Sequence, residues 1–234
     1  MIILNTRPAA HGAAFVREFS HLGAPIVHSP VLTAHILPAW PTTVDDYDAV
    51  IFTSPMAPAL RPADPGWRDL PVFAVGEATA AAARAAGFGD VRCTGHTAVD
   101  LCAVLSTQTF RRALHPSGAD ITRDVAAAFP GRVERVAVYR MIAATALSPE
   151  AAALLRTPTE LIVPLFSRRS AAAFAALARS VAARRAALTA VGISAHALDI
   201  ASPPWHGAIA VPVPTAPAMA AAVADHLNPR RAAA

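Results

Sequence analysis

The stretch VFAVGEATAAAARAAGF, residues 72–88, joins three signals of secondary structure. A short apolar run is followed by a lone glycine, a hydroxyl residue at Thr79 and an alanine-rich run that ends at Gly87. Short apolar runs are typical of buried strands, alanine favours helices, and glycine is common directly after the last turn of a helix. The stretch therefore predicts a strand, a tight turn and a helix in succession.

The same order of elements is predicted along most of the chain. Apolar strands are expected at residues 2–5, 49–53, 71–75, 161–166, 187–191 and 207–211, with weaker candidates near 26, 91 and 112. Alanine-rich helices are expected at residues 9–22, 79–86, 98–105, 120–129, 170–183 and 217–227. Such alternation is typical of α/β proteins whose parallel sheets are covered by helices on both faces.

Two extended segments interrupt this alternation, PVLTAHILP at 30–38 and ERVAVYRMIAA at 134–144. If they pair as antiparallel strands, the chain leaves one lobe, builds a second and returns to the first. We therefore expect an α/β fold with two similar lobes, each a parallel β-sheet flanked by helices, joined by a two-stranded β ladder. The first lobe would comprise residues 1–29 and 145–234, and the inserted lobe residues 39–133.

Two pairs of similar segments indicate an internal repeat. AVIFTSPMAPAL (49–60) and VPLFSRRSAAAF (163–174) each place a serine, Ser54 or Ser167, directly after a strand. The turn of the opening stretch returns in LTAVGISAHAL, residues 188–198. The repeat indicates that the two lobes share one architecture.

Hydroxyl residues follow the predicted strands in both lobes. Ligands of parallel α/β sheets bind at the carboxyl ends of the strands, where helix N-termini present free N–H groups. Ser54, Thr79, Ser167 and Ser194 all come shortly after strands, so we expect them to line a cleft between the lobes. The alternative is that each hydroxyl only caps the N-terminus of a helix.

The charged residues favour an anionic small molecule as the ligand. All 20 basic residues are arginine, the acidic residues number 16, and the net charge is +4. Arginine suits carboxylates and phosphates, and the scattered positions do not form the basic patch expected of a nucleic-acid-binding protein. The alternative is that most arginines lie on solvated helix faces.

The hydropathy pattern predicts neither a membrane protein nor a secreted one. The most apolar stretch, 208–227, contains three prolines, and the first residues lack the basic leader of a signal peptide. Cys93 and Cys102 fit no zinc spacing and are expected to be unpaired, buried side chains. We expect a cytoplasmic protein.

The common cofactor motifs are missing from the sequence. AVGEATA (74–80) has one glycine where dinucleotide and triphosphate sites need several, and Ser54 does not stand in the GxSxG motif of esterases. The nine histidines are dispersed and form no HxxxH pair. We therefore expect no cofactor and no metal site.

A set of motifs stands in an order and spacing similar to those of a known family. They are TRP (6–8), IFTSP (51–55), VFAVGEATA (72–80), an HPSG turn (115–118), VAVYR (136–140), LFSRRSAAAF (165–174) and AVGISAHAL (190–198). The ordered set covers nearly the whole chain and resembles the uroporphyrinogen-III synthase family. The resemblance implies two α/β lobes joined by a two-stranded ladder, in agreement with the pattern above.

The resemblance also implies an activity, that of a cyclising lyase of tetrapyrrole (haem) biosynthesis. Such an enzyme closes linear hydroxymethylbilane to uroporphyrinogen III, inverting ring D and releasing water. The eight carboxylates of this substrate would give arginines and backbone N–H groups their partners. We expect a monomer with no nucleic-acid or membrane partner, and the preceding pathway enzyme, hydroxymethylbilane synthase, is a candidate partner.

The resemblance further implies site residues. Tyr139 in VAVYR is expected to donate a proton to the departing hydroxyl, because a phenol keeps its proton at neutral pH and needs no metal to donate it. The alternative is a half-buried tyrosine on a ladder strand. Substrate binding is implied for Thr79, Ser54, Ser167, Ser194, Arg7, Gly76 and Ser117.

A second hypothesis comes from another functional class. A protein of this shape could be a non-catalytic two-lobe module that binds a small molecule similar to a tetrapyrrole, because a fold does not fix a function. Isomer-specific ring closure would distinguish the enzyme from the binding module.

Overall fold

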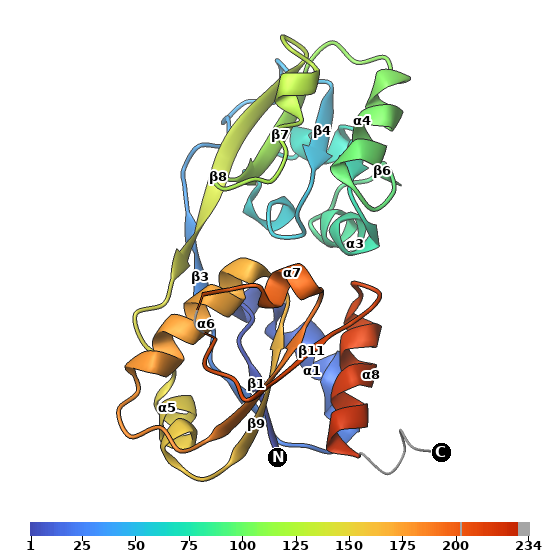
Figure 1. The fold of residues 1–234 in the computed structure, drawn as a ribbon. Helices are drawn as coiled ribbons and strands as arrows, with labels where there is room; N and C mark the ends of the chain where they lie inside the picture. Colours follow the sequence, from blue (N-terminus) through green and yellow to red (C-terminus); the bar gives the residue numbers. More distant parts are fainter. Residues whose placement is uncertain (202, 229–234) are drawn as a thin grey trace. The chain divides into compact units, whose positions relative to one another are not determined.

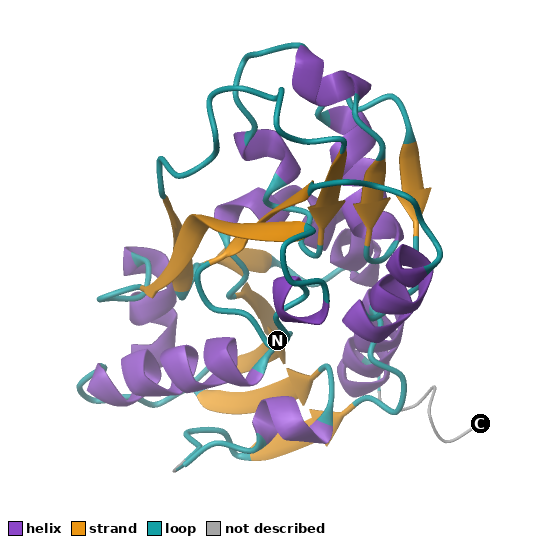
Figure 2. Ribbon diagram, turned by 90° about the horizontal axis from the view of Figure 1, so that it is seen from above, coloured by secondary structure: helices purple, strands orange, loops and turns teal. Residues whose placement is uncertain are grey.

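The structure, a computed structural model, describes residues 1–201 and 203–228 (Figure 1). The chain divides into two compact units, one made of residues 1–33 and 142–234, the other of residues 34–141. In both units helices surround the strands (Figure 2). The predicted class, an α/β fold with two helix-flanked and largely parallel sheets, is confirmed.

Within the described residues, the first unit holds a five-stranded parallel sheet, called sheet A, in the order β11-β10-β9-β1-β2. Its strands are β1 (Ile2–Asn5), β2 (Ile26–His28), β9 (Glu160–Leu165), β10 (Ala187–Gly192) and β11 (Gly207–Ala210). Its helices are η1 (Ala9–His11), α1 (Gly12–Phe19), η2 (Ser20–Leu22), α5 (Pro149–Arg156), α6 (Arg168–Ser180), α7 (Ala195–Leu198) and α8 (Ala216–Leu227), η marking a 3₁₀-helix. Helices α5 and α6 lie on one side of the sheet, and α1 and α8 on the other (Figure 1).

The unit of residues 34–141, described throughout, holds most of sheet B, whose order is β3-β8-β7-β4-β5-β6. The strands are β3 (Leu32–Ile36), β4 (Ala49–Phe52), β5 (Val72–Ala74), β6 (Val91–Cys93), β7 (Ala113–Gly118) and β8 (Val133–Ala143). The helices are η3 (Pro58–Leu60), α2 (Gly66–Asp69), α3 (Glu77–Ala85), α4 (Ala98–Ser106) and η4 (Ala126–Ala128). All neighbouring strands from β8 to β6 run parallel.

Strand β3 runs antiparallel to β8. The N–H of Leu37 donates to the carbonyl of Val138 at 2.9 Å, and the N–H of Ala144 donates to the carbonyl of Val31 at 3.0 Å. In these two bonds one residue number rises as the other falls, which is the antiparallel pattern. The two-stranded ladder of β3 and β8 is part of sheet B, because β8 also pairs with β7 over most of its length.

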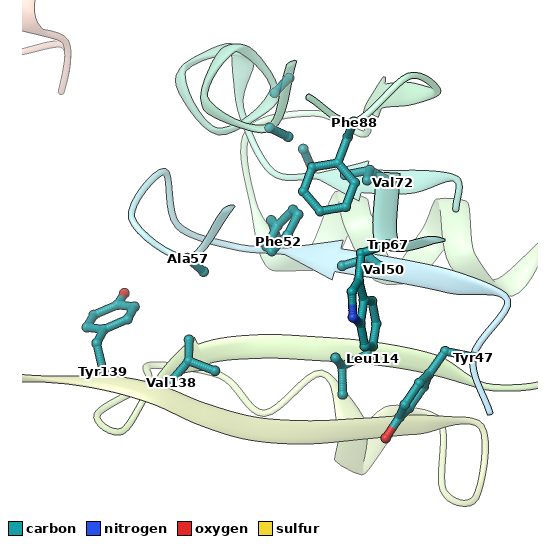
Figure 3. Close-up of a cluster of buried hydrophobic side chains, with 13 residues drawn as sticks. Tyr47, Val50, Phe52, Ala57, Trp67, Val72, Phe88, Leu114, Val138 and Tyr139 are labelled. Carbon is teal, nitrogen blue, oxygen red and sulfur yellow. The ribbon is translucent and has the colours of Figure 1, made fainter. Parts of the chain in front are cut away.

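Sheet B buries side chains on both of its faces. Along β4, Val50 and Phe52 point to one face, whereas Ala49 and Ile51 point to the other, as alternation in a strand requires. The first face packs in an aromatic cluster with Trp67, Phe88, Tyr47 and Tyr139 (Figure 3). The second face packs in an α4 cluster with Leu101 and Leu105. Burial on both faces explains the uninterrupted apolar run of this strand.

The predicted helix at 120–129 is wrong, because only η4 (Ala126–Ala128) is helical there. Polar and β-branched residues precede η4, and the carboxylate of Asp124 accepts a hydrogen bond from the N–H of Ala126 at 3.0 Å. A side chain that binds nearby backbone in this way favours a turn over a continuous helix. The alanine run that suggested a helix is too short to override these groups.

The predicted turn HPSG at 115–118 is also wrong, because these residues form the buried end of β7. The pairing of β7 with β4 ends at Leu114, so Pro116, which has no N–H, removes no ladder bond on that side. The cysteines are both free, as predicted, but Cys93 is exposed and Cys102 only partly buried.

Three α-helices in the described part of the chain were not predicted, α2, α5 and α7. Helices α2 and α7 have four residues each, too few to show a helical period in the sequence. Helix α5 does carry a start signal, since Ser148 caps it and Pro149 follows at the first helical position. This signal alone would have identified α5.

Candidate active site

A cavity of about 460 Å³ lies where the parallel strands of sheet B end. Its lining residues come after β4, β5, β6 and β7, and from β8: Thr53, Ser54, Val75, His96, Thr97, Ala98, Gly118, Asp120, Ile121, Thr122, Arg123 and Tyr139. The carboxyl ends of parallel strands are the usual ligand site of α/β sheets, and the volume is in the range of small-molecule sites. All of these residues belong to the unit of residues 34–141.

Tyr139 and Ser54 form a hydrogen-bonded pair in this cavity. The phenol of Tyr139 donates to Ser54 Oγ at 2.9 Å, and Ser54 Oγ also accepts from the N–H of Met56 at 3.3 Å. Only 8% of Tyr139 is exposed. The sequence named both residues, and the structure brings them together.

A register shift turns the ring of Tyr139 toward this pair. Strand β8 pairs with β7 through Ala137 opposite Ser117 and then Tyr139 opposite Gly118, so the pairing skips Val138. In a regular strand Val138 and Tyr139 would face opposite sides of the sheet, yet both belong to the aromatic cluster. A β-bulge of this kind re-aims a side chain next to a site.

Gly118 makes room for the phenol ring. A Cβ atom on Gly118 would lie 3.0 Å from Cε2 and Cζ of Tyr139 and 3.1 Å from its hydroxyl oxygen. Distances this short require the neighbouring ring to move. Gly118 therefore sets how closely Tyr139 can approach β7.

A second hydroxyl reaches the cavity from the other face of the sheet. Thr53 Oγ1 lies 3.1 Å from Nε2 of His115, a histidine with no exposed surface. Burial lowers the pKa of His115 to about 4, with a smaller contribution from the charge of Arg135, while Asp124 acts in the opposite direction. His115 is therefore neutral at neutral pH.

The N-terminus of α4 forms one wall of the cavity. Thr97 caps this helix with a capping box, in which Thr97 Oγ1 accepts from the N–H of Asp100 and the Asp100 carboxylate accepts from the N–H of Thr97. The carboxylate also accepts from the N–H of His96. Hydrogen bonding to its carboxylate lowers the pKa of Asp100, most strongly through the Thr97 side chain and then through the N–H groups of His96 and Thr97.

Arg135 fixes the start of the loop that carries the remaining lining residues. Its guanidinium donates to Ser117 Oγ at 2.9 Å, and to the carbonyls of Gly118 and Ala119 at 2.8 and 2.9 Å. The loop that follows contributes four consecutive residues to the cavity, 120–123. Ser117, a predicted site residue, is buried under Arg135 and does not line the cavity.

Gly76 and Thr79 lie at the start of α3, next to the lining residue Val75. Gly76 is the N-cap, with φ +76° and ψ 150°, a conformation that favours glycine. The alternative that Thr79 caps a helix is wrong, because Thr79 is the third helical residue and is 3% exposed. Neither residue lines the cavity, and substrate binding by them stays a prediction.

Three predicted site residues belong to the other unit, at the carboxyl ends of sheet A strands. Ser167 and Ser194 cap α6 and α7, their Oγ atoms accepting from Ser170 and Ala197 N–H groups at 3.1 and 3.2 Å. Arg7 follows β1 and stacks its guanidinium carbon 4.1 Å from the centre of the Phe166 ring. Burial lowers the pKa of Arg7. Both serines thus cap helices, and substrate binding by them stays a prediction. Ser194 and Thr79 do not occupy equivalent positions.

Sequence reasoning missed Thr53, His115 and the loop residues 120–123. A signal for Thr53 was present, because it precedes Ser54 directly after β4. The contact of His115 with Thr53 depends on the register of β4 against β7, which no sequence pattern contains. The loop was missed because it was taken for a helix.

Residues 1–201 and 203–228 contain neither a candidate metal site nor a candidate membrane-spanning helix. No cluster of three or more histidine, cysteine, aspartate or glutamate side chains lies close enough to hold a metal ion. No helix combines the length and the apolar character needed to cross a bilayer.

A family model described as uroporphyrinogen-III synthase HemD matches residues 13–221. This chain belongs to the uroporphyrinogen-III synthase family. Like other members it is a cyclising lyase of tetrapyrrole biosynthesis, and the family implies hydroxymethylbilane as the substrate. The match covers both units of the chain, the cavity included.

Solved structures of synthases resemble the chain at low identity. The crystal structure of the uroporphyrinogen-III synthetase from Helicobacter pylori has a TM-score of 0.65 and 15% identity, over 97% of this chain and 99% of that one. A mutant synthase from the extremely thermophilic bacterium Thermus thermophilus has a TM-score of 0.49 and 18% identity, over 98% and 100%. No curated protein matched the sequence. The likeness to the Helicobacter pylori structure shows a shared fold.

Proposed function

We propose that this chain closes hydroxymethylbilane to uroporphyrinogen III, with inversion of ring D, at the cavity formed by the carboxyl ends of sheet B. The pair of Tyr139 and Ser54 carries the proposal, because it holds a phenol proton donor in a cavity that belongs to a synthase-family chain. Hydroxymethylbilane closes unaided to the unturned isomer, so the protein must direct the closure as well as speed it. Positioning of the reacting ends therefore supplies much of the catalysis.

Tyr139 is the proposed acid for the loss of the substrate hydroxyl. The carbon–oxygen bond breaks as the phenol proton moves to the departing oxygen, water leaves, and the resulting cation is delocalised over ring A. Ser54 Oγ accepts the hydrogen bond of the resting phenol, so it holds the acid in place. The hydroxyl hydrogen of Ser54 can then stabilise the phenolate.

The same phenolate can complete the proton balance. Ring D attacks through its substituted carbon, and the spiro intermediate fragments and closes again with ring D turned over. The last step loses a proton from ring D, and the phenolate of Tyr139 takes it up. One water is the only product besides the macrocycle, and the phenol is restored.

Arginines at the carboxyl ends of both sheets are the proposed partners of the substrate carboxylates. Arg123 lines the cavity, and Arg7 presents its guanidinium while stacked on Phe166. Such charge-assisted hydrogen bonds are strong and can be bidentate. Contacts from Ser167, Ser194, Thr79, Gly76 and Ser117 remain part of the proposal on the strength of their motifs.

We also propose that the chain works as a cytoplasmic monomer next to hydroxymethylbilane synthase. The substrate closes spontaneously to the wrong isomer, so rapid transfer from the enzyme that makes it would be an advantage. Light scattering after size-exclusion chromatography tests the monomer. Chromatography of the mixed enzymes tests the association.

A coupled assay tests the proposed function. Hydroxymethylbilane is generated in situ, the purified chain is added, and the oxidised products are separated into uroporphyrin isomers. Predominant isomer III is the expected result. Isomer I alone, formed at the rate seen without the chain, would contradict the proposal and favour a binding module.

A further inference from the structure

We propose that Thr53 donates a hydrogen bond to the substrate at the reacting centre, and that His115 is the positioning residue that fixes the direction of this bond. The proposal rests on the proposed function of the cavity. It adds a second hydroxyl, next in sequence to Ser54, whose direction a buried histidine sets.

Alternation along β4 brings the two hydroxyls to the cavity from opposite faces of sheet B. Ser54 continues the face of Phe52, which packs in the aromatic cluster, and meets Tyr139 there. Thr53 continues the face of Ile51, which packs in the α4 cluster, and meets His115 there. Both hydroxyl residues line the cavity. The strand end therefore presents two hydroxyls, each held by a different side chain.

The surroundings of His115 indicate which ring nitrogen carries the proton. Nε2 lies 3.1 Å from Thr53 Oγ1, whereas Nδ1 is buried and has no hydrogen-bond partner within the described residues. The charges of Arg135 and Asp124 act on the ring through space and not through such a bond. Among backbone groups, buried N–H donors without a partner are rarer than under-satisfied acceptors, and we apply the same preference to the imidazole. The proton therefore belongs on Nε2.

This tautomer decides what Thr53 can do. If Nε2–H donates to Thr53 Oγ1, the hydroxyl hydrogen of Thr53 cannot point back at His115. It is left to point away from the ring, toward the cavity that Thr53 lines. Thr53 then offers a donor, already oriented, to an oxygen of the substrate. Orientation before the reaction is what makes such donors effective in catalysis.

Four variants test this arrangement in the coupled assay. Thr53→Val keeps the shape but removes the hydroxyl, and we expect kcat to fall roughly tenfold or more with little change in KM. Thr53→Ser should keep kcat within about twofold. His115→Leu should resemble Thr53→Val, and His115→Gln should restore part of the rate through its amide N–H.

Thr94→Val is the matched control. Thr94 also lies at the end of a sheet B strand and is buried, but its hydroxyl donates to the carbonyl of Ala74 at 3.2 Å and it does not line the cavity. Its loss should leave kcat and KM unchanged. An unchanged kcat in a folded Thr53→Val variant, or an effect on KM alone, would overturn the proposal for Thr53. The wild-type chain must make isomer III in the same experiment, so a failure of the proposed function is recognised separately.

The tautomer of His115 can be measured directly in the folded wild-type chain. Nitrogen-15 NMR of the full chain labelled on histidine distinguishes Nε2–H from Nδ1–H imidazoles. The signal that His115→Gln removes identifies His115. We expect the Nε2–H form at pH 7, and an Nδ1–H form would overturn the positioning role of His115.

Discussion

The two tyrosines of this chain are equally buried, yet they lie in different chemical surroundings. Each is 8% exposed, and they occupy opposite ends of the aromatic cluster (Figure 3). Tyr47 precedes β4 and donates its hydroxyl to the carboxylate of Glu134 at 2.9 Å. Tyr139 lies at the cavity end and donates to the neutral hydroxyl of Ser54 at the same distance.

In the proposed mechanism, the hydrogen-bond partner and not burial distinguishes the acid from the other tyrosine. Burial and the carboxylate of Glu134 raise the pKa of Tyr47 to about 12, so this phenol is a poor acid. Glu134 also pairs with Arg112 at 2.5 Å, which completes a structural network on the amino side of the sheet. Ser54 carries no charge that would hold the proton of Tyr139.

The strongest test removes each phenol hydroxyl in turn. Tyr139→Phe should lower kcat about 10²- to 10⁴-fold, the usual range for losing a general acid, while circular dichroism shows an intact fold. Tyr47→Phe, the matched control from the other end of the cluster, should keep its rate. Equal rates in the two variants would remove the proton-donor role of Tyr139.

A pH series should measure how the buried, neutral His115 affects stability. Unfolded histidine, with a pKa near 6.5, takes up a proton that folded His115 does not accept until about pH 4. The unfolded chain therefore binds more protons in this window, and stability falls as the pH is lowered through it. Between pH 7 and pH 4 the free energy of unfolding should drop by roughly 3 kcal/mol more in the wild type than in His115→Gln. Urea denaturation measures the free energy of unfolding of the two proteins at each pH. The same pH dependence in both would contradict a buried neutral His115.

Filling the space beside Tyr139 should have a smaller effect. Gly118→Ala places a methyl group 3.0 Å from the ring, which must shift by a few tenths of an ångström and weaken its bond to Ser54. We expect kcat to fall roughly tenfold. Gly89→Ala, next to the amino end of β6, meets only the carbonyl of Arg68 at 3.9 Å and should be neutral. Similar rates for the two alanine variants would show that the ring position is not critical.

The smallest effect is expected from Tyr47, at the amino ends of the sheet B strands. Tyr47→Phe removes one hydrogen bond, and Glu134 keeps its pairing with Arg112. The free energy of unfolding should fall by about 1 kcal/mol, measured by thermal or urea denaturation. A loss of several kcal/mol would mean that the network on the amino side is a main determinant of stability.

Most of the fold was predictable because it follows from where apolar residues fall. Strands such as β4, buried on both faces, are continuous apolar runs, and the helices between them are rich in alanine. The predictions for two segments were wrong because local groups determine their structure. Asp124 binds the backbone that a helix would use, and the end of β7 contains Pro116 where a strand was not expected.

The site was predictable only in part. Ser54 and Tyr139 were named from motifs, and their proximity could not have been deduced from periodicity, because the register shift at Val138 reverses the side to which Tyr139 points. The meeting of Thr53 with His115 depends on the alignment of two strands far apart in the sequence. Contacts of this kind are fixed by sheet register, which the residues of one strand do not specify.

We propose that the substrate reacts at the Tyr139 end of the aromatic cluster. The chain contains only two tyrosines, so NMR of ring-labelled tyrosine gives two sets of signals, which Tyr47→Phe and Tyr139→Phe assign. Uroporphyrinogen III is added under anaerobic conditions and the shifts are followed. The signals of Tyr139 should move and those of Tyr47 should stay in place. Movement of Tyr47 with Tyr139 unchanged would contradict the account.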